Sequence, residues 1–364
     1  RPTSSDFPLK FTYAQGSPAE EAAAATLVQL NATQGLWPLR DDTSQIPDGF
    51  DYTSTQEDLD MVALADHVYL EGGELPAGWK ILEHIHIPSK AFFHPLQDAT
   101  DRIALYSQGS TCVLAISGSD QNDIGDWLNN FNSIFTKSFC GRSWYHKGFV
   151  NELEAILSNS EFEKAVLPKA AECSRSGRLV IVGHSLGGAV ATNLAECINA
   201  EDTWSWLWGH GKPKALRNFP RKEVWLYTFG APATRRNIAA SNDLAKDGVF
   251  KGKRFFAYDN PFCEHRYCAP WCCESHFSWA VQDPVPWVAS VTGFWHPKIV
   301  AIGLDKSGKK KEYWKATNQD SYVEPDTFLP KIDPFSSWQM EALLNEHLLV
   351  PTYKPRLEKA LAKR

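Results

Sequence analysis

The sequence lacks the features that would place it in several large classes of protein. No uninterrupted apolar run approaches the roughly 18–20 residues that a membrane-spanning helix requires, so we expect no transmembrane segment. The net charge is −6 and the pI is about 6.0, so the basic excess typical of nucleic-acid binders is missing. There is no internal repeat, low-complexity tract or convincing linker. These absences favour one globular main domain within the 364 residues.

Cysteine, in contrast, is present in an even number, which favours disulfide bonds and an oxidising compartment. A zinc site among the four cysteines between 263 and 273 is the alternative. Their spacing matches no tetrahedral zinc motif, so we predict no metal site. Asn31-Ala32-Thr33 is a glycosylation acceptor that agrees with secretion, and we expect that a signal peptide preceding Arg1 has been removed. The disulfide candidates are Cys112, Cys140, Cys173, Cys197, Cys263, Cys268, Cys272 and Cys273, in unassigned pairs.

Short apolar segments alternate with helical patterns along the chain, which is typical of a doubly wound α/β domain with a mostly parallel sheet. We expect residues 51–364 to form this domain and residues 1–50 to form an N-terminal extension packed on it. The run Leu179–Val182 is typical of a strand buried on both faces. The expected strands are 81–87, 102–107, 112–116, 179–182, 224–228, 277–281, 299–304 and 311–314, the last two as a hairpin. The expected helices are 18–30, 54–70, 148–172, 187–199 and 233–246.

The clearest functional signal is the pentapeptide Gly183-His184-Ser185-Leu186-Gly187, which directly follows the expected strand 179–182. A serine hydroxyl is a poor nucleophile unless it is exposed, positioned and served by a base. A G-x-S-x-G pattern between a strand and a helix is typical of the nucleophile elbow of α/β-hydrolases, a tight turn that admits only small residues on either side. The pattern predicts that Ser185 is a nucleophile. We expect His184, whose side chain leaves the turn in another direction, to be structural.

The acid and the base of such a triad follow the serine in the order Asp or Glu, then His. Asp283 comes directly after the expected strand 277–281 and is the predicted acid, although an Asp before Pro is also a common turn former. The histidines beyond it are His296 and His347. His296 precedes the strand 299–304, on the wrong side of it for a loop at the carboxyl edge of the sheet. We therefore predict His347 as the base and His296 as a structural histidine.

With these residues located, the chain resembles the class 3 lipases, the fungal triacylglycerol lipase family. The resemblance implies the α/β-hydrolase fold and an oxyanion hole formed by the backbone N–H groups of Ser119 and Leu186. One departure is Ile116-Ser117-Gly118-Ser119, where the family has Phe-Arg-Gly followed by Thr or Ser. The matching segments, in the family's order, are Val113–Ser119, His146–Phe149, Val182–Ala189, Tyr227–Pro232, Gln282–Pro286 and Glu346-His347.

The resemblance also implies a lid after Ser119. Four apolar residues there are spaced as on one face of a short helix, and a surface helix that packs on the core is the alternative. The insertion Trp204–Lys222 carries three tryptophans and five basic residues, and we expect a packed segment with a solvated basic face rather than a membrane-docking patch. The predicted lid residues are Ile124, Trp127, Leu128 and Phe131.

Together these features predict a secreted, monomeric serine hydrolase that needs no cofactor and cleaves carboxylic esters of lipids at a lipid–water interface, as a triacylglycerol lipase does. The apolar lid stripe and the 14 tryptophans favour a lipid substrate. Phospholipase A1, galactolipase and feruloyl esterase activities on the same scaffold are alternatives. A catalytically silent lipid- or partner-binding protein and a zinc-dependent interaction module are alternatives from other classes. Competent residues at every triad and oxyanion position argue against a silent protein.

Overall fold

The computed structural model describes eleven stretches of the chain, all within the compact unit Pro38–Arg364. The predicted N-terminal extension, the helix 18–30 and the strand 277–281 lie outside the described residues. The described stretches are 55–70, 73–88, 100–118, 135–200, 211–220, 223–236, 250–257, 296–297, 299–304, 310–313 and 347–362.

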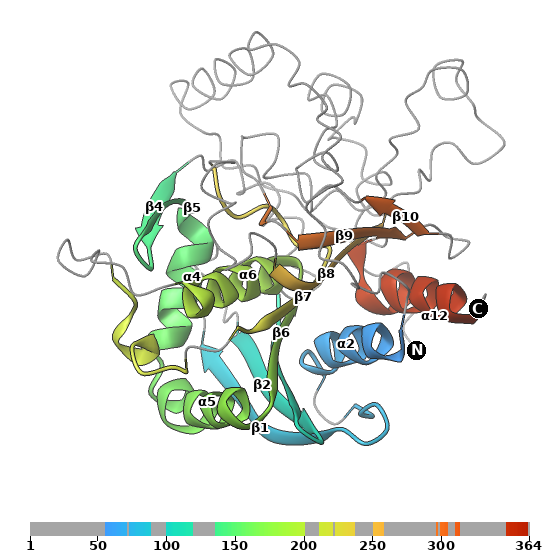
Figure 1. Ribbon diagram of the computed structural model, residues 1–364, viewed down its shortest axis with the longest axis horizontal. Helices are drawn as coiled ribbons and strands as arrows, with labels where there is room; N and C mark the ends of the chain where they lie inside the picture. Colours follow the sequence, from blue (N-terminus) through green and yellow to red (C-terminus); the bar gives the residue numbers. More distant parts are fainter. Residues whose placement is uncertain are drawn as a thin grey trace, which may run out of the picture. The chain divides into compact units, whose positions relative to one another are not determined.

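Eight of the described strands form one sheet in the order β1-β2-β3-β6-β7-β8-β9-β10 (Figure 1). The five central strands are parallel, and β1, β2 and β10 add to the two sides antiparallel. This arrangement confirms the predicted mostly parallel α/β fold. The bounds are β1 (Lys80–Pro88), β2 (Thr100–Gln108), β3 (Thr111–Ile116), β6 (Arg178–His184), β7 (Trp225–Phe229), β8 (Phe250–Ala257), β9 (Ile299–Leu304) and β10 (Lys310–Tyr313). A separate ladder pairs β4 (Thr136–Phe139) with β5 (Arg142–His146).

Helices cover both faces of the sheet, so β6 is buried on both sides as its sequence predicts. Leu179 and Ile181 pack in the core beneath α4, α5 and α6, whereas Val180 and Val182 pack in the core with α2 and α12 (Figure 1). None of the described helices is long and apolar enough to cross a bilayer. The bounds are α2 (Gln56–His67), α4 (Lys147–Ser158), α5 (Leu167–Ser176), α6 (Ser185–Asn199) and α12 (Lys354–Ala362), with short turns η2 (Phe162–Val166), η4 (Lys214–Leu216) and η8 (Leu349–Tyr353).

Two helix predictions were wrong in part. The expected helix 148–172 is broken at Asn159, whose extended backbone ends α4 and whose side-chain oxygen accepts the N–H groups of Glu161 and Phe162. Asparagine favours such local hydrogen bonds over a continuing helix. The expected helix 233–246 does not begin at its predicted start, because Arg235 forms a β-bridge with Tyr145. Residues 237–246 lie outside the described part.

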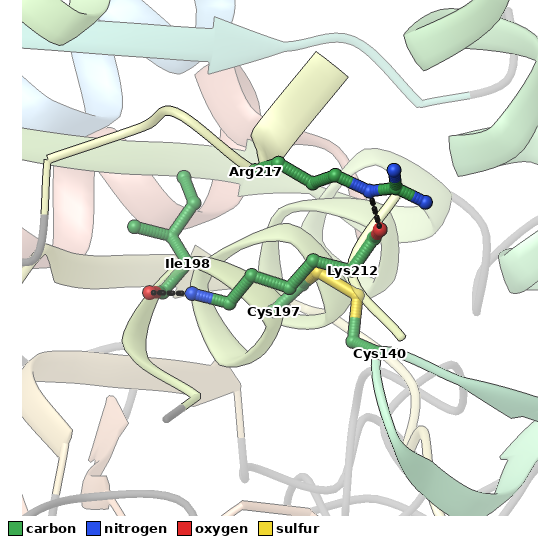
Figure 2. Close-up of a disulfide and its surroundings, with 5 residues drawn as sticks. All are labelled: Cys140, Cys197, Ile198, Lys212 and Arg217. Atoms are coloured by element: carbon green, nitrogen blue, oxygen red, sulfur yellow. Dashed lines mark hydrogen bonds between the residues drawn. A yellow bond between two sulfur atoms is a disulfide. The ribbon is translucent and has the colours of Figure 1, made fainter. Parts of the chain in front are cut away.

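The four described cysteines form two disulfides, which confirms the disulfide prediction for them. Cys112 of β3 is bonded to Cys173 of α5, and Cys140, in the β4–β5 turn, is bonded to Cys197 near the end of α6. Beside the second bond, Lys212 donates to the Ile198 carbonyl at 3.2 Å (Figure 2). This end of α6 is thus held by a covalent bond and by a cation near its negative dipole end. The candidates Cys263, Cys268, Cys272 and Cys273 lie outside the described residues.

A buried ion pair ties α2 to the sheet. The Asp58 carboxylate accepts from Lys253 Nζ of β8 at 2.9 and 2.8 Å, and the two residues are 0 % and 4 % exposed. Asp58 also closes the capping box of α2 with Thr55, whose N–H it accepts at 3.0 Å. Since the charges lie out of water, each depends on its counter-charge.

Replacing Asp58 with asparagine is therefore expected to lower the free energy of unfolding by about 3–5 kcal/mol, because it leaves a buried ammonium without its carboxylate. Urea unfolding would measure the loss. The double variant Asp58→Asn/Lys253→Met should recover most of it. Glu223→Gln is the control: it breaks the partly exposed pair with Lys251 and should cost about 1 kcal/mol or less. A loss that small for Asp58→Asn would contradict this assignment.

Candidate active site

Ser185 lies at the junction of β6 and α6 in the strained backbone that the pentapeptide predicts. Its φ is +57°, in the left-handed region that non-glycine residues rarely adopt, and it is 1 % exposed. The glycines around it allow close backbone contact. A Cβ on Gly183 would lie 2.3 Å from the Gly187 oxygen, and a Cβ on Gly187 would lie 2.3 Å from the Ile116 oxygen. The spacing of the motif is therefore a packing requirement of this turn.

His347 is brought to the same turn from the far end of the chain. His347 is fully buried. The centroid of its ring is 4.5 Å from the centroid of the His184 ring, and the planes of the two rings differ by 32°. The Ser185 hydroxyl has no hydrogen-bond partner among the described residues, so the Ser–His bond of a triad is not formed in this structure. Catalytic hydrogen bonds of unliganded enzymes are often long and tighten only in the substrate complex.

The start of α6 is suited to stabilising negative charge. Leu186 is the second residue of this helix, and the N–H groups of a first helical turn have no acceptor within the helix. The first turn carries no acidic residue, and the N-cap residue, His184, makes no side-chain capping bond. The positive end of the helix dipole therefore lies beside the Ser185 hydroxyl, where an oxyanion would form in acyl transfer.

Gly118, which directly precedes the predicted oxyanion residue Ser119, packs closely against this turn. A Cβ on Gly118 would lie 2.7 Å from the His184 carbonyl oxygen, 2.8 Å from Tyr69 Oη and 3.1 Å from Ser185 Cβ. Two of these neighbours, the His184 carbonyl oxygen and Ser185 Cβ, belong to the turn itself, so they cannot easily move away from an added methyl group. The end of β3 and the start of α6 are therefore in contact at the site.

A Gly118→Ala substitution is expected to lower kcat for ester hydrolysis by about 10–100-fold, because the added methyl displaces the oxyanion loop from Ser185. Steady-state kinetics would measure this. Gly73→Ala provides the control, since a Cβ there meets side-chain atoms only at ordinary distances of 3.4 Å and more. An unchanged kcat in Gly118→Ala would show that the loop tolerates displacement.

Both other histidines considered in the sequence are engaged elsewhere. His184 Nε2 donates to the His347 carbonyl at 2.7 Å, and His184 Nδ1 lies 3.2 Å from Tyr69 Oη. His296 is buried, and its Nε2 accepts from Arg254 Nη1 of β8 at 2.9 Å. The sequence interpretation did not include Tyr69, since a single tyrosine just after a helix belongs to no motif.

The structure thus packs His347 against His184, the residue that precedes Ser185 and Leu186, while the other predicted site residues lie outside the described part. Within the described stretches, no group of three or more His, Cys, Asp or Glu side chains is arranged to hold a metal. The zinc alternative concerns cysteines that lie outside those stretches. The predicted residues outside the described part are Asp283, Ser119, Ile124, Trp127, Leu128, Phe131 and Asn31.

The known proteins that are similar to this chain and that we describe below are all named as lipases. Residues 113–256 match the family model of lipase (class 3). A curated relative, secreted mono- and diacylglycerol lipase 1 of Fusarium solani, is 30% identical over 110 residues, which is 29% of this chain and 31% of the relative. The alignment thus spans about a third of the relative's length.

Two solved structures are also similar to this chain. Lipase II from Rhizopus niveus has a TM-score of 0.46 at 16% identity and covers 68% of this chain and 79% of its own. The Rhizomucor miehei lipase propeptide complex has a TM-score of 0.47 at 17% identity, and the match covers 80% of this chain and 87% of the chain in that structure.

Proposed function

We propose that this chain, whose residues 113–256 match the family model of lipase (class 3), is a secreted serine hydrolase that cleaves carboxylic esters of lipids. The family match over residues 113–256 includes Gly118, Ser185 and Leu186. The observation that carries the proposal is the position of Ser185: a serine with φ +57° at the start of a helix, directly after His184, whose ring packs on the buried His347. This combination of strain, helix dipole and adjacent base is suited to acyl transfer.

The proposed reaction proceeds through a covalent acyl-enzyme. The Ser185 hydroxyl attacks the ester carbonyl while His347 takes its proton, and the tetrahedral oxyanion accepts from the N–H groups of Ser119 and Leu186. His347 then gives the proton to the leaving alcohol. A water molecule, deprotonated by His347, then attacks the acyl carbonyl carbon. The bond from that carbon to Ser185 Oγ breaks, and His347 returns the proton to Oγ as the fatty acid leaves. Asp283 orients His347 and stabilises its charged form.

The proposal also covers the location of the protein, the extent of its catalytic domain and its lid. Disulfides such as Cys112–Cys173 and Cys140–Cys197 are typical of an oxidising compartment, and the matched Fusarium lipase is named as secreted, so both observations support export. We propose residues 51–364 as the catalytic domain of a monomer. Its lid, with the apolar residues Ile124, Trp127, Leu128 and Phe131, would open at a lipid surface.

For the substrate, we propose acylglycerols. The matched relative is named for mono- and diacylglycerols, and the sequence resemblance is to triacylglycerol lipases. The triad chemistry is the same for each of these esters, so the distinction depends on residues that shape the acyl and alcohol sites.

An ester panel tests this function. Wild type and Ser185→Ala would be assayed on mono-, di- and triacylglycerol, phosphatidylcholine, a galactolipid and methyl ferulate, both below and above the concentration at which the lipids aggregate. We expect the highest kcat/KM on an acylglycerol, a rise above the aggregation point, and no activity in the variant. Preference for phosphatidylcholine, galactolipid or ferulate would replace the substrate assignment and retain the mechanism. Inactivity on every ester would favour a silent binding protein.

A further inference from the structure

Tyr69, which is partly buried, joins three segments of the proposed active site through one chain of hydrogen bonds. Its hydroxyl oxygen lies 2.6 Å from the Gly118 nitrogen and 3.2 Å from His184 Nδ1. The other ring nitrogen of His184, Nε2, lies 2.7 Å from the His347 carbonyl oxygen. Gly118 follows β3 and His184 ends β6. Tyr69 lies in the turn after α2, so the chain of contacts begins at a segment that carries none of the predicted catalytic residues.

The direction of each hydrogen bond follows from the groups involved. The Gly118 amide can only donate, so Tyr69 Oη accepts from it and has its own proton available for His184 Nδ1. The His347 carbonyl can only accept, so the His184 proton lies on Nε2. A neutral imidazole protonated at Nε2 has its lone pair on Nδ1, which is the atom that faces the Tyr69 hydroxyl.

The surroundings of His184 keep it in that neutral form. Burial lowers the pKa of His184 well below its usual value, and the positive charge that His347 can carry lowers it further, although the bond to the His347 carbonyl raises it. Every link of the chain therefore joins a suitable donor to a suitable acceptor, and a satisfied network of this kind, shielded in part from water, favours one geometry.

From this geometry, and resting on the proposed function, we infer that Tyr69 is a positioning residue that sets the oxyanion loop and the base relative to Ser185. It holds Gly118, from which Ser119 follows, and consumes the Gly118 N–H, so that this group cannot serve the oxyanion. Through His184 it also holds the His347 backbone, against whose ring His184 packs. Misplacement of either group would slow acyl transfer more than it would weaken substrate binding.

The decisive variant is Tyr69→Phe, which removes the hydroxyl and keeps the ring that packs edge-on against His184. The structure offers a matched control in Tyr106, whose hydroxyl lies 2.9 Å from His67 Nδ1, while His67 Nε2 lies 3.0 Å from the Gly73 carbonyl. This second network repeats the same hydroxyl–imidazole–carbonyl chemistry without contact to Ser185. Tyr106→Phe therefore reports what the loss of such a network does to stability alone.

We expect Tyr69→Phe to lower kcat by about 10–100-fold with KM changed by less than about threefold, and Tyr106→Phe to leave kcat unchanged at a similar loss of thermal stability. The rates are measured on the acylglycerol found best for the wild type. Each rate is divided by the concentration of active sites, which is determined by titration with a fluorogenic phosphonate ester. A kcat within twofold of the wild type in Tyr69→Phe, or an equal fall in Tyr106→Phe, would overturn the inference.

Two further variants keep the test decisive. Should Tyr69→Phe not fold, His184→Asn retains an acceptor for Tyr69 but loses the bond to the His347 carbonyl, and an unchanged kcat in it would also overturn the inference. In the double variant Tyr69→Phe/His184→Asn, the losses should be less than additive, because both belong to one network. Ser185→Ala separates the two proposals. Wild-type activity in Ser185→Ala would refute the serine mechanism itself. An inactive Ser185→Ala together with wild-type activity in Tyr69→Phe would refute only the role of Tyr69.

Discussion

Ser185→Ala is expected to lower kcat/KM for ester hydrolysis by about 10⁴–10⁶-fold. Without the Oγ atom no acyl-enzyme forms, and only binding and the oxyanion donors remain to accelerate attack by water. Stability should be almost unaffected, because alanine adopts the same left-handed backbone as serine and the lost hydroxyl has no hydrogen-bond partner among the described residues.

The matched control for this substitution lies on the same helix. Thr192 of α6 is buried, and its hydroxyl donates to the Gly188 carbonyl at 2.8 Å. Thr192→Val removes that hydroxyl at nearly constant shape and should retain most of the activity. Initial rates on the preferred acylglycerol, together with melting temperatures, decide the comparison. Wild-type rates in Ser185→Ala would refute the assignment of the nucleophile.

His347→Ala should have an effect of the same size, because a serine without its base is deprotonated too rarely to attack. His296→Ala is the informative counterpart, since His296 was the other histidine beyond Asp283. It binds Arg254 of β8 and should lose stability while keeping most of its kcat. The double variant Ser185→Ala/His347→Ala should be little worse than either single variant, because the two groups act as one unit. The reverse ranking of His347→Ala and His296→Ala would reassign the base.

The parts of the fold that sequence could predict are those in which local pattern and burial agree. Leu179–Val182 is apolar because β6 is covered on both faces, and the small residues after Ser185 are required by contacts that no larger side chain allows. The hairpin of β9 and β10 was likewise confirmed. In each case one short segment contains all the information needed.

The parts that escaped prediction depend on partners far along the chain. The central strand β8 has the sequence FKGKRFFA, which resembles an exposed segment until Lys253 is seen to be neutralised by Asp58, 195 positions earlier. Tyr69 and His184 are 115 positions apart, and nothing in either sequence neighbourhood signals their hydrogen bond. Within the candidate site, the nucleophile is a local feature, whereas its supporting network is a property of the folded chain.

The central claim, that Ser185 is the acylated nucleophile, is tested most directly by its covalent capture. The protein is incubated with a long-chain phosphonate ester and digested, and the peptide carrying the adduct is identified by mass spectrometry. We expect one phosphonyl group per chain, on Ser185, formed at the rate at which activity is lost, and no adduct on the His347→Ala variant over the same time. Loss of activity with the adduct on another residue, or unhindered hydrolysis by protein fully labelled at Ser185, would contradict it.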